Sequence, residues 1–477
     1  MPSFFRCSIT AAIALTLLSG CRKEEAKSDL GASAAVLSPA EKKKEEALID
    51  RMYPLHARVT GVHLALRLQP DAEAPPVGWV RMGAWLRLKE GRKRGPQCRS
   101  GWMEVHPKGW ICSGQGLEIR KQAPSGETKP QESESALPFD YYFVKEYLVP
   151  EFHRPPSRNE QRATSEFVAQ VQKLKSVDAD KARKAAEGQI TIELPRPAVV
   201  RRFLDRGFYV AGVGFETRAS RRFLRTVTGT FVKESHLELR RGSDFHGVEL
   251  EGRSLPLAFA VRAGRPLLRR NKADGSIRFV EDPEAEVIAR HSLIEGWEKR
   301  EEIDGKPMHV LKDGHYLRGW FLAVVEAIKP PKRTRDDEPW VHVDLSEQTL
   351  VLYRGKTPLF ATLVSTGLPD FKTPVGVFTM ERKYRSEPMS ALGPDAGDER
   401  YRIDDVPWTQ YFHRSMALHG AFWHDRFGLP RSHGCVNLSP QDAQRVFSET
   451  WPTLPPGWHG VATRGTGFPA SRVVVTE

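Results

Sequence analysis

Residues 415–438 read SMALHGAFWHDRFGLPRSHGCVNL, which places three histidines and one cysteine within seventeen positions. The pattern up to His419 predicts a strand that ends at this histidine, next to a glycine. The Ser-His-Gly after the intervening loop predicts a tight turn into Cys435. The segment therefore fits three descriptions: a thiol nucleophile with its base, a metal site, or a crowded loop.

A helix is expected directly after the cysteine. Residues 439–442 read SPQD, a capping-box pattern with proline at the first helical position. The next apolar residues fall on one helical face that we expect to be buried, and they are Ala443, Val446 and Phe447. Cys435 then lies in a rigid turn before a helix start, where its own amide and that of Gly434 can point at a developing oxyanion.

A cysteine becomes nucleophilic when a base removes its proton. The ordinary pKa of a thiol is about 8.5, and an adjacent histidine lowers that pKa and takes the proton. Either His419 or His433 can serve Cys435 in this way. The spacing alone does not decide which imidazole faces the sulfur.

The other two descriptions of the segment are weaker. A zinc site of His419, His424, His433 and Cys435 has suitable ligand types but lacks paired cysteines and an HExxH motif. A structural free cysteine prefers apolar surroundings, whereas glycine, serine and histidine surround this one. His424 by itself is expected at the loop surface. We therefore expect thiol chemistry, with no metal and no organic cofactor.

The composition bounds the fold class. A chain of 477 residues exceeds the size of one hydrophobic core, so several domains are expected. With 40% hydrophobic and 28% charged residues, 35 prolines and 38 glycines, the chain fits a loop-rich, mainly β, multidomain protein. The net charge of +12 attracts anionic polymers, but no long basic run with aromatic neighbours is present, so nucleic acid is not an expected partner.

The first twenty residues point to export. Ile9–Leu18 is an apolar stretch too short to span a bilayer but typical of a signal peptide. It runs into Leu18-Ser19-Gly20-Cys21, which resembles the lipobox of bacterial lipoproteins. That resemblance implies removal of residues 1–20, a lipid anchor on Cys21 and a periplasmic lipoprotein of the cell envelope. The residue after the lipid-bearing cysteine, Arg22, resembles the pattern that directs some such lipoproteins to the outer membrane. An ordinary secretory signal with Cys21 incidental is the alternative.

Export makes the cysteine count informative, because disulfides form in oxidising compartments. Cys98 and Cys112 lie close together in one segment, whereas Cys435 lies more than three hundred residues away. We predict a Cys98–Cys112 disulfide and a free thiol at Cys435. A free thiol in such a compartment indicates that its reactivity is used.

The middle of the chain is predicted to form small modules. Residues 21–52 are a charged tether that cannot bury a core. Three hairpin patterns resemble those of bacterial SH3-like β-barrels. Each has an aromatic-aliphatic pair at or just after its turn, and these pairs are Trp110-Ile111, Phe231-Val232 and Tyr316-Leu317. The expected order is a β module over 53–120, a Pro-rich and helical connector over 121–200 with one surface helix at Arg162–Glu187, and further β modules over 201–327.

A C-terminal domain is expected after a linker at 328–338. Val341, Val343 and Leu345 alternate with polar residues, and two further alternating runs follow, which predicts a β-meander with one apolar face. The domain is expected to cover 339–465 and to leave 466–477 as a tail.

These residues carry a resemblance to a known family. His419-Gly420 and Ser432-His433-Gly434-Cys435, with twelve residues between His419 and Ser432, are similar to the active-site signature of the L,D-transpeptidase (YkuD-type) catalytic domain. The stretch TPVGVF at 373–378 and the opening meander resemble that family too. The likeness covers about residues 338–465.

The resemblance implies a reaction on peptidoglycan stem peptides. The nucleophile, Cys435, would attack the amide before the terminal D-Ala of a tetrapeptide stem, release D-Ala and form a thioester. An amine of a second stem would then resolve the thioester. His419 would be the general base and the Gly420 carbonyl would orient it, while His433, Ser432 and Gly434 would shape the turn and support the thiolate.

The resemblance also implies residues that bind substrate. Tyr401 stands where some members carry a lid tyrosine that helps the oxyanion. Trp423 lies in the loop beside the cleft. Some relatives have arginine where this chain has Asn437, which leaves carboxylate recognition open. Water or a protein amine as acceptor, and a wall-binding scaffold without activity, are the alternatives.

Overall fold

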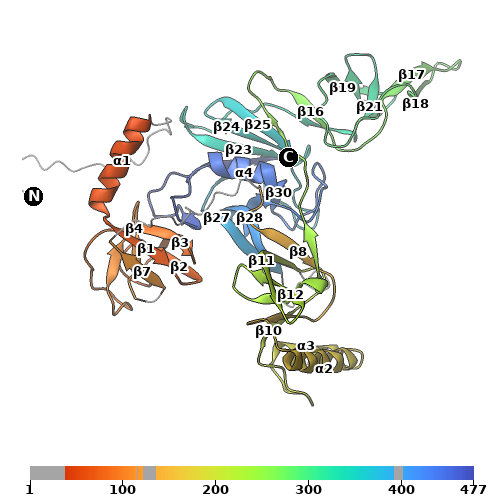
Figure 1. Ribbon diagram of the computed structural model, residues 1–477. Coiled ribbons are helices and arrows are strands. Elements are labelled where there is room, and N and C mark those ends of the chain that lie inside the picture. Colours follow the sequence, from red (N-terminus) through yellow and green to blue (C-terminus); the bar gives the residue numbers. More distant parts are fainter. Residues whose placement is uncertain (1–37, 115, 122–135, 392–400) are drawn as a thin grey trace, which may run out of the picture. The chain divides into compact units, whose positions relative to one another are not determined.

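The computed structural model describes residues 38–114, 116–121, 136–391 and 401–477 (Figure 1). The predicted signal segment and the lipid site at Cys21 lie outside the described residues. Among the described residues, no helix is long and apolar enough to cross a membrane. The predicted disulfide pair is joined, with the Cα atoms of Cys98 and Cys112 5.7 Å apart.

The described chain is mainly β, as its composition predicts. Its strands form five sheets. A three-stranded sheet has the order β4 (Trp85–Leu88), β1 (Leu55–Val59), β7 (Leu117–Arg120). A two-stranded sheet joins β16 (Leu257–Ala260) to β22 (Leu322–Val325). A five-stranded sheet has the order β18 (Ile277–Glu281), β17 (Leu267–Asn271), β21 (Tyr316–Arg318), β20 (Lys306–Leu311), β19 (Trp297–Ile303).

The largest sheet has sixteen strands. Its main path is β10 (Val200–Leu204), β9 (Val149–Phe152), β13 (Phe231–Lys233), β12 (Arg221–Thr226), β11 (Tyr209–Arg218), β28 (Tyr401–His413), β27 (Arg382–Ala391), β31 (Gly460–Ala462), β3 (Pro76–Arg81), β2 (His63–Arg67), β6 (Trp110–Cys112) and β5 (Trp102–Glu104). Branches add β8 (Asp140–Val144), β14 (Leu237–Arg240), β29 (Met416–Gly420) and β30 (Val436–Leu438). A 3-10 turn, η1 (Glu234–His236), precedes β14.

The three predicted hairpins are present as antiparallel pairs, β5 with β6, β12 with β13 and β20 with β21. The first two pairs belong to the sixteen-stranded sheet and the third to the five-stranded sheet, and none of the sheets of the described residues closes into a barrel. The SH3-like character of these modules therefore stays a prediction.

The predicted single helix is wrong, because two helices replace it. They are α2 (Arg158–Lys175) and α3 (Ala179–Glu187), which lie side by side (Figure 1). The break occurs where Asp178 caps α3 by accepting a hydrogen bond from the Lys181 amide, which starts a new helix. Phe167 and Ala185 are buried in a small core that the two helices share with Leu148 and Phe203. By contrast, α1 (Pro39–Met52), in the predicted tether, buries no residue.

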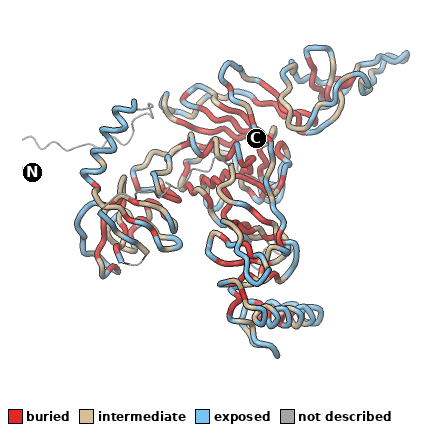
Figure 2. The backbone as a smooth tube through the Cα atoms, in the orientation of Figure 1, coloured by how far each residue is buried: buried red, intermediate tan, exposed pale blue. Residues whose placement is uncertain are grey.

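The predicted meander forms the centre of a six-stranded sheet. Its strands are β23 (Pro339–Asp344), β24 (Thr349–Arg354) and β25 (Thr357–Leu363), paired antiparallel in sequence order. Residues 466–477, expected as a tail, instead supply β32 (Arg472–Thr476), which pairs in parallel with β23 and antiparallel with β26 (Gly376–Thr379). Figure 2 shows these central strands as buried.

A strand from the predicted middle module completes this sheet. It is β15 (Val248–Glu249), which pairs with the edge of β25. Gly247 permits the approach, because a Cβ atom there would lie 2.3 Å from the carbonyl oxygen of Ala361. The sheet of the C-terminal domain therefore includes residues that lie about ninety positions before it in the sequence.

The helix predicted after the cysteine is α4 (Pro440–Glu449), with Ser439 as its N-cap. Its buried face carries Ala443, Val446 and Phe447, as expected, and packs in one core with Leu418 and Val436. The carboxyl end of α4 is closed by Lys383, a fully buried side chain from β27. Lys383 Nζ donates to the carbonyl oxygens of Phe447 and Thr450, both at 2.7 Å, and burial lowers the pKa of this amine well below its usual range.

Removal of this lysine should destabilise the C-terminal domain. We expect Lys383→Met to lower the free energy of unfolding by about 2–4 kcal/mol, because two buried carbonyls lose their hydrogen-bond donor. Urea denaturation followed by tryptophan fluorescence measures this. Lys356→Met, at an exposed turn, is the control and should change stability by less than about 0.5 kcal/mol. Equal effects of the two substitutions would contradict the capping role.

Candidate active site

The register of two strands brings the predicted base and nucleophile together. Strands β29 and β30 run parallel, with Leu418 opposite Val436 and His419 opposite Asn437. Cys435 directly precedes β30, so it is opposite Ala417. Side chains two positions apart on a strand point to one face. His419 and Cys435 therefore face the same side of the strand pair.

His419 is held as a neutral base. Its side chain is 3% exposed, and Nδ1 lies 3.3 Å from the carbonyl oxygen of Gly420. The carbonyl can only accept, so Nδ1 carries the proton and Nε2 keeps its lone pair. Burial lowers the pKa of His419 to about 4, which leaves the imidazole neutral at pH 7. The orienting role expected of Gly420 matches this geometry.

Cys435 is half-buried and is the free cysteine of the described residues. Its sulfur lies 3.9 Å from the carbonyl oxygen of Ser415. Burial raises the pKa of the Cys435 thiol above its usual range, and the Ala417 amide opposes this in part. The Cys435 thiol and the His419 imidazole are therefore both neutral at pH 7.

Hydrogen bonds fix the turn that carries the cysteine. Ser432 Oγ donates to the carbonyl oxygen of Cys435 at 2.5 Å and accepts from the Gly434 amide at 3.1 Å. Gly434 has φ +107°, which disfavours other residues there. Its amide is thus used by the turn, and the expectation that it points at an oxyanion is wrong. The Cys435 amide remains the expected backbone donor.

Thr373 anchors the turn from a distant loop. The buried Thr373 hydroxyl donates to the carbonyl oxygen of Gly434 and accepts from the Gly367 amide, both at 3.0 Å. The sequence indicated this stretch only through its family resemblance. A buried hydroxyl that satisfies two backbone groups so near the cysteine is a positioning residue.

His433 lies between two aromatic rings. Its imidazole is 4.4 Å from the Phe371 ring and 5.8 Å from the Tyr401 ring, measured between centroids, and it is stacked on the latter. Burial and the charge of an ionised Cys435 both raise the pKa of Tyr401, which places the phenol within electrostatic reach of the sulfur. The structure thus brings His433, Tyr401 and Cys435 together.

The expected surface position of His424 is wrong, because its side chain is buried. Nδ1 of His424 accepts from the Arg426 amide at 3.2 Å, so Nε2 must carry the proton. Nε2 lies 2.9 Å from the side-chain amide of Asn437, whose carbonyl oxygen must then be the acceptor. Both nitrogens of His424 are engaged, so neither can bind a metal. Burial lowers the pKa of His424 to about 3.

This arrangement leaves the Asn437 amide donor facing the site. The polar atom of Asn437 that does not face His424 is buried and has no partner in the described part of the chain. Asn437 lies opposite His419 in the strand register. With the amide assigned in this way, the atom without a partner is the NH₂ group. The Trp423 ring lies next to this base, with its centroid 5.7 Å from that of the His419 ring.

Residues from before position 250 also support the site. Tyr141 stacks on Phe422 with centroids 4.0 Å apart, and its hydroxyl donates to the carbonyl oxygen of Asp405. Tyr209 contacts the rings of Phe422 and Trp423 at 5.4 and 6.4 Å. The sequence carries no local signal for these contacts, because they join segments more than two hundred positions apart.

Two consecutive acids of β28 are held by different segments. Asp404 pairs with Arg202 at 3.3 Å, and Asp405 pairs with Arg81. The Trp408 indole donates to the carbonyl oxygen of Ala136 at 2.6 Å. The strand that begins with Tyr401 is therefore fixed from outside the C-terminal domain.

The predicted capping box is only half formed. Ser439 Oγ accepts from the Asp442 amide at 3.2 Å, but the Asp442 carboxylate does not return to the N-cap. It accepts from His246 Nδ1 at 2.7 Å and from the Gly247 amide at 3.0 Å. The buried Asp442 carboxylate raises the pKa of His246. The helix after the cysteine is thus tied to the residues that lead into β15.

Residues 338–461 match the L,D-transpeptidase catalytic domain family, YkuD. Probable L,D-transpeptidase 3 of Mycobacterium tuberculosis (strain ATCC 25618 / H37Rv) is 35% identical over 89 residues, which are 18% of this chain and 33% of that protein. The chain spans about a third of the length of this curated relative.

Solved structures of L,D-transpeptidases are also similar to the chain. The structure of L,D-transpeptidase 3 from Mycobacterium tuberculosis is 17% identical, with 46% of this chain and 83% of that chain covered and a TM-score of 0.24. The catalytic domain from the E. faecium L,D-transpeptidase is 20% identical, with 29% and 98% covered and a TM-score of 0.22.

The neutral thiol–imidazole pair predicts a distinct pH dependence. We expect the rate of Cys435 alkylation by iodoacetamide to fall on the acid side only near pH 4, because His419 can accept a proton until it is itself protonated. Rates measured by mass spectrometry between pH 3 and 8 test this. In His419→Ala, where only the thiolate can react, the rate should instead fall steadily as the pH is lowered through the whole range. An acid limb near pH 6.5 in the parent protein would contradict the buried neutral base.

The Thr373 anchor predicts a positioning effect. We expect Thr373→Val to slow alkylation of Cys435 by about 5–10-fold, because the loss of hydrogen bonds worth about 1 kcal/mol each loosens the turn. Thr373→Ser keeps the hydroxyl and should restore most of the rate. If valine and serine behave alike, the hydroxyl does not position the turn.

Proposed function

We propose that the protein is a peptidoglycan L,D-transpeptidase. The observation that carries the proposal is the parallel register of β29 and β30, which sets Cys435 and the neutral His419 on one face. It occurs within the residues that match the catalytic domain family. In the proposed reaction, a tetrapeptide stem is the acyl donor and an amine of a second stem is the acceptor.

The first half of the reaction forms a thioester. The Cys435 proton passes to His419 Nε2 as the sulfur attacks the carbonyl carbon of the amide before the terminal D-Ala. The carbonyl oxygen gains negative charge, and we assign its stabilisation to the Cys435 amide and the Tyr401 hydroxyl, which is supported by the electrostatic influence of Cys435 on Tyr401. The carbon–nitrogen bond then breaks, the proton on His419 passes to the leaving nitrogen, and D-Ala departs.

The second half releases the product. The acceptor amine attacks the thioester carbon and gives a proton to His419. The carbon–sulfur bond breaks, and the proton returns to the Cys435 thiolate, so that the resting pair is restored. Asn437 and Trp423 border this face, and we assign them to substrate binding. None of these steps calls for a cofactor.

Two other functions remain as outcomes of the test. With water as acceptor, the same thioester gives an L,D-carboxypeptidase. Without thioester formation, the chain is a wall-binding scaffold. A protein amine as acceptor would be a variant of the proposed transfer.

Products separate these functions. The full chain is incubated with a disaccharide-tetrapeptide, and the products are analysed by liquid chromatography and mass spectrometry. The proposal expects free D-Ala and a cross-linked dimer. Cys435→Ala should reduce both by at least about 10³-fold. A tripeptide without dimer would indicate the carboxypeptidase, and no turnover by a folded protein with a reduced thiol would contradict the enzyme.

We also propose the cell envelope as the location of the protein, with a lipid on Cys21 in the outer membrane as its anchor. Support comes from the lipobox-like LSGC sequence and from Arg22. Metabolic labelling with a fatty acid, lost in Cys21→Ser, tests the anchor. Labelling that persists in the variant would contradict it.

A further inference from the structure

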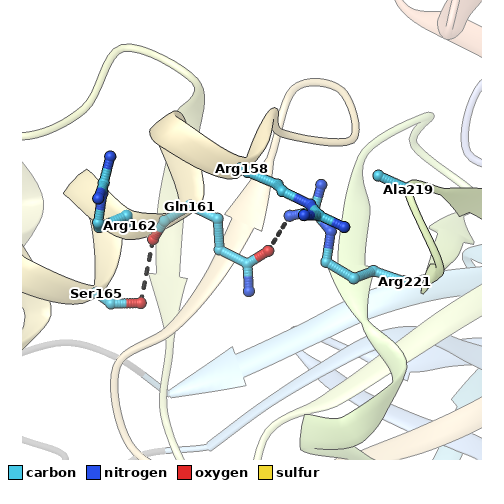
Figure 3. Close-up of a pocket in the computed structure, with 6 residues that line it drawn as sticks. All are labelled: Arg158, Gln161, Arg162, Ser165, Ala219 and Arg221. Atoms are coloured by element: carbon cyan, nitrogen blue, oxygen red, sulfur yellow. Dashed lines mark hydrogen bonds between the residues drawn. The ribbon is translucent and has the colours of Figure 1, made fainter.

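A second cavity lies apart from the cysteine site. It measures about 430 Å³ and opens between the first turns of α2 and the hairpin turn that joins β11 to β12 (Figure 3). Its lining consists of Arg158, Gln161, Arg162, Ser165, Ala219 and Arg221. Three of these six residues are arginines and none is acidic. The cavity shares no residue with the cysteine site.

Arg221 forms a fixed wall of this cavity. Its guanidinium donates to Gln161 Oε1 and to the carbonyl oxygen of Pro156, the latter at 2.9 Å (Figure 3 shows the Gln161 contact). It also lies over the Phe223 ring at 5.6 Å. The Nε atom of Arg221 is buried and has no partner among the described residues.

The positive charge of the cavity is not balanced nearby. Glu160, the acid closest in sequence, binds Arg154 and the Ser157 cap, and these contacts lower its pKa to about 2. Arg158 and Arg162 have no ion pair in the described part of the chain. They stand on the first two turns of α2, where the helix dipole adds partial positive charge. Together these groups favour an anion.

The cavity continues into a second, less charged one. This neighbour measures about 180 Å³ and shares Gln161 and Ser165 with the first. Its lining includes apolar or aromatic residues, among them Tyr147, Leu148, Pro150, Val168 and Ala169. Lys233, His236 and Glu146 also line it, and Glu146 pairs with His236 at 3.0 Å. Because the two cavities share lining residues on α2, we call them together the α2 groove, with a cationic end at the three arginines and a floor whose charges largely cancel.

We propose that the α2 groove binds a carboxylate-bearing peptide of the cell wall. Arginine guanidinium groups match carboxylates in bidentate geometry, and the neutral floor suits the small apolar side chains of such a peptide. The choice of a wall peptide rests on the proposed function, whereas the anionic character of the ligand does not. The groove would hold polymeric substrate while the distant cysteine acts on a stem.

The test uses the full chain carrying Cys435→Ala, so that no turnover occurs. Binding of a disaccharide-tripeptide is measured by calorimetry, beside the same ligand with its carboxylates amidated. We expect Arg158→Ala with Arg162→Ala to weaken binding of the acidic ligand at least tenfold, and to leave the amidated ligand unaffected. Higher salt should weaken only the acidic ligand in the parent chain.

The matched control removes the same charge elsewhere. Arg269→Ala with Arg270→Ala alters two exposed arginines of β17 and should leave binding unchanged. Equal losses in both double variants would mean that net charge alone attracts the ligand, and would overturn the proposal. So would unchanged binding in the α2 variant, or a loss that appears with anionic phospholipid vesicles instead of the peptide.

Failure of this proposal and failure of the proposed function can be told apart. With Cys435 restored, the α2 variant should still release D-Ala from a small soluble stem at the parent rate. Groove binding without any D-Ala release would retain the groove and reject the enzyme. D-Ala release without groove binding would retain the enzyme and reject the groove.

Discussion

The parallel pairing of β29 with β30 is the constraint on which the site depends. One register sets Cys435 and His419 on the same face and places Asn437 opposite the base. A shift by one residue would turn every side chain of β30 to the other face. The register is protected from both ends, since Ser432 and Thr373 fix the turn before β30 and α4 packs directly after it. Local chemistry and tertiary packing therefore hold the same geometry.

Local patterns in the sequence predicted the parts of the site that local chemistry determines. The strand that ends at His419, the tight turn before Cys435 and the start of α4 all follow from residue types at short spacing. The division of one expected helix into α2 and α3 follows from a cap at Asp178 that the periodicity concealed. His424 was misplaced because a loop histidine carries no signal of burial. Its environment is set by Asn437 and Arg426, which only the folded chain brings to it.

Long-range contacts could not be predicted in this way. Asp442 fits a capping box by spacing, yet its carboxylate binds His246 from nearly two hundred positions earlier. In the same way, β15 completes the sheet of the meander, and β32 enters it from the expected tail. The residues that match the catalytic domain family are thus only part of the structural unit. Tyr141 and Arg81 extend that unit further, since both act on Asp405 in the strand that carries Tyr401.

The most direct test of the central claim is the mass of the intact protein after brief exposure to a disaccharide-tetrapeptide, followed by acid quench and peptide mapping. The account predicts an added mass equal to the donor without its terminal D-Ala, carried by the peptide that contains Cys435. It predicts a much slower gain of this mass in His419→Ala. A folded, reduced protein that gains no mass, or gains it at another residue, would contradict acyl transfer through Cys435.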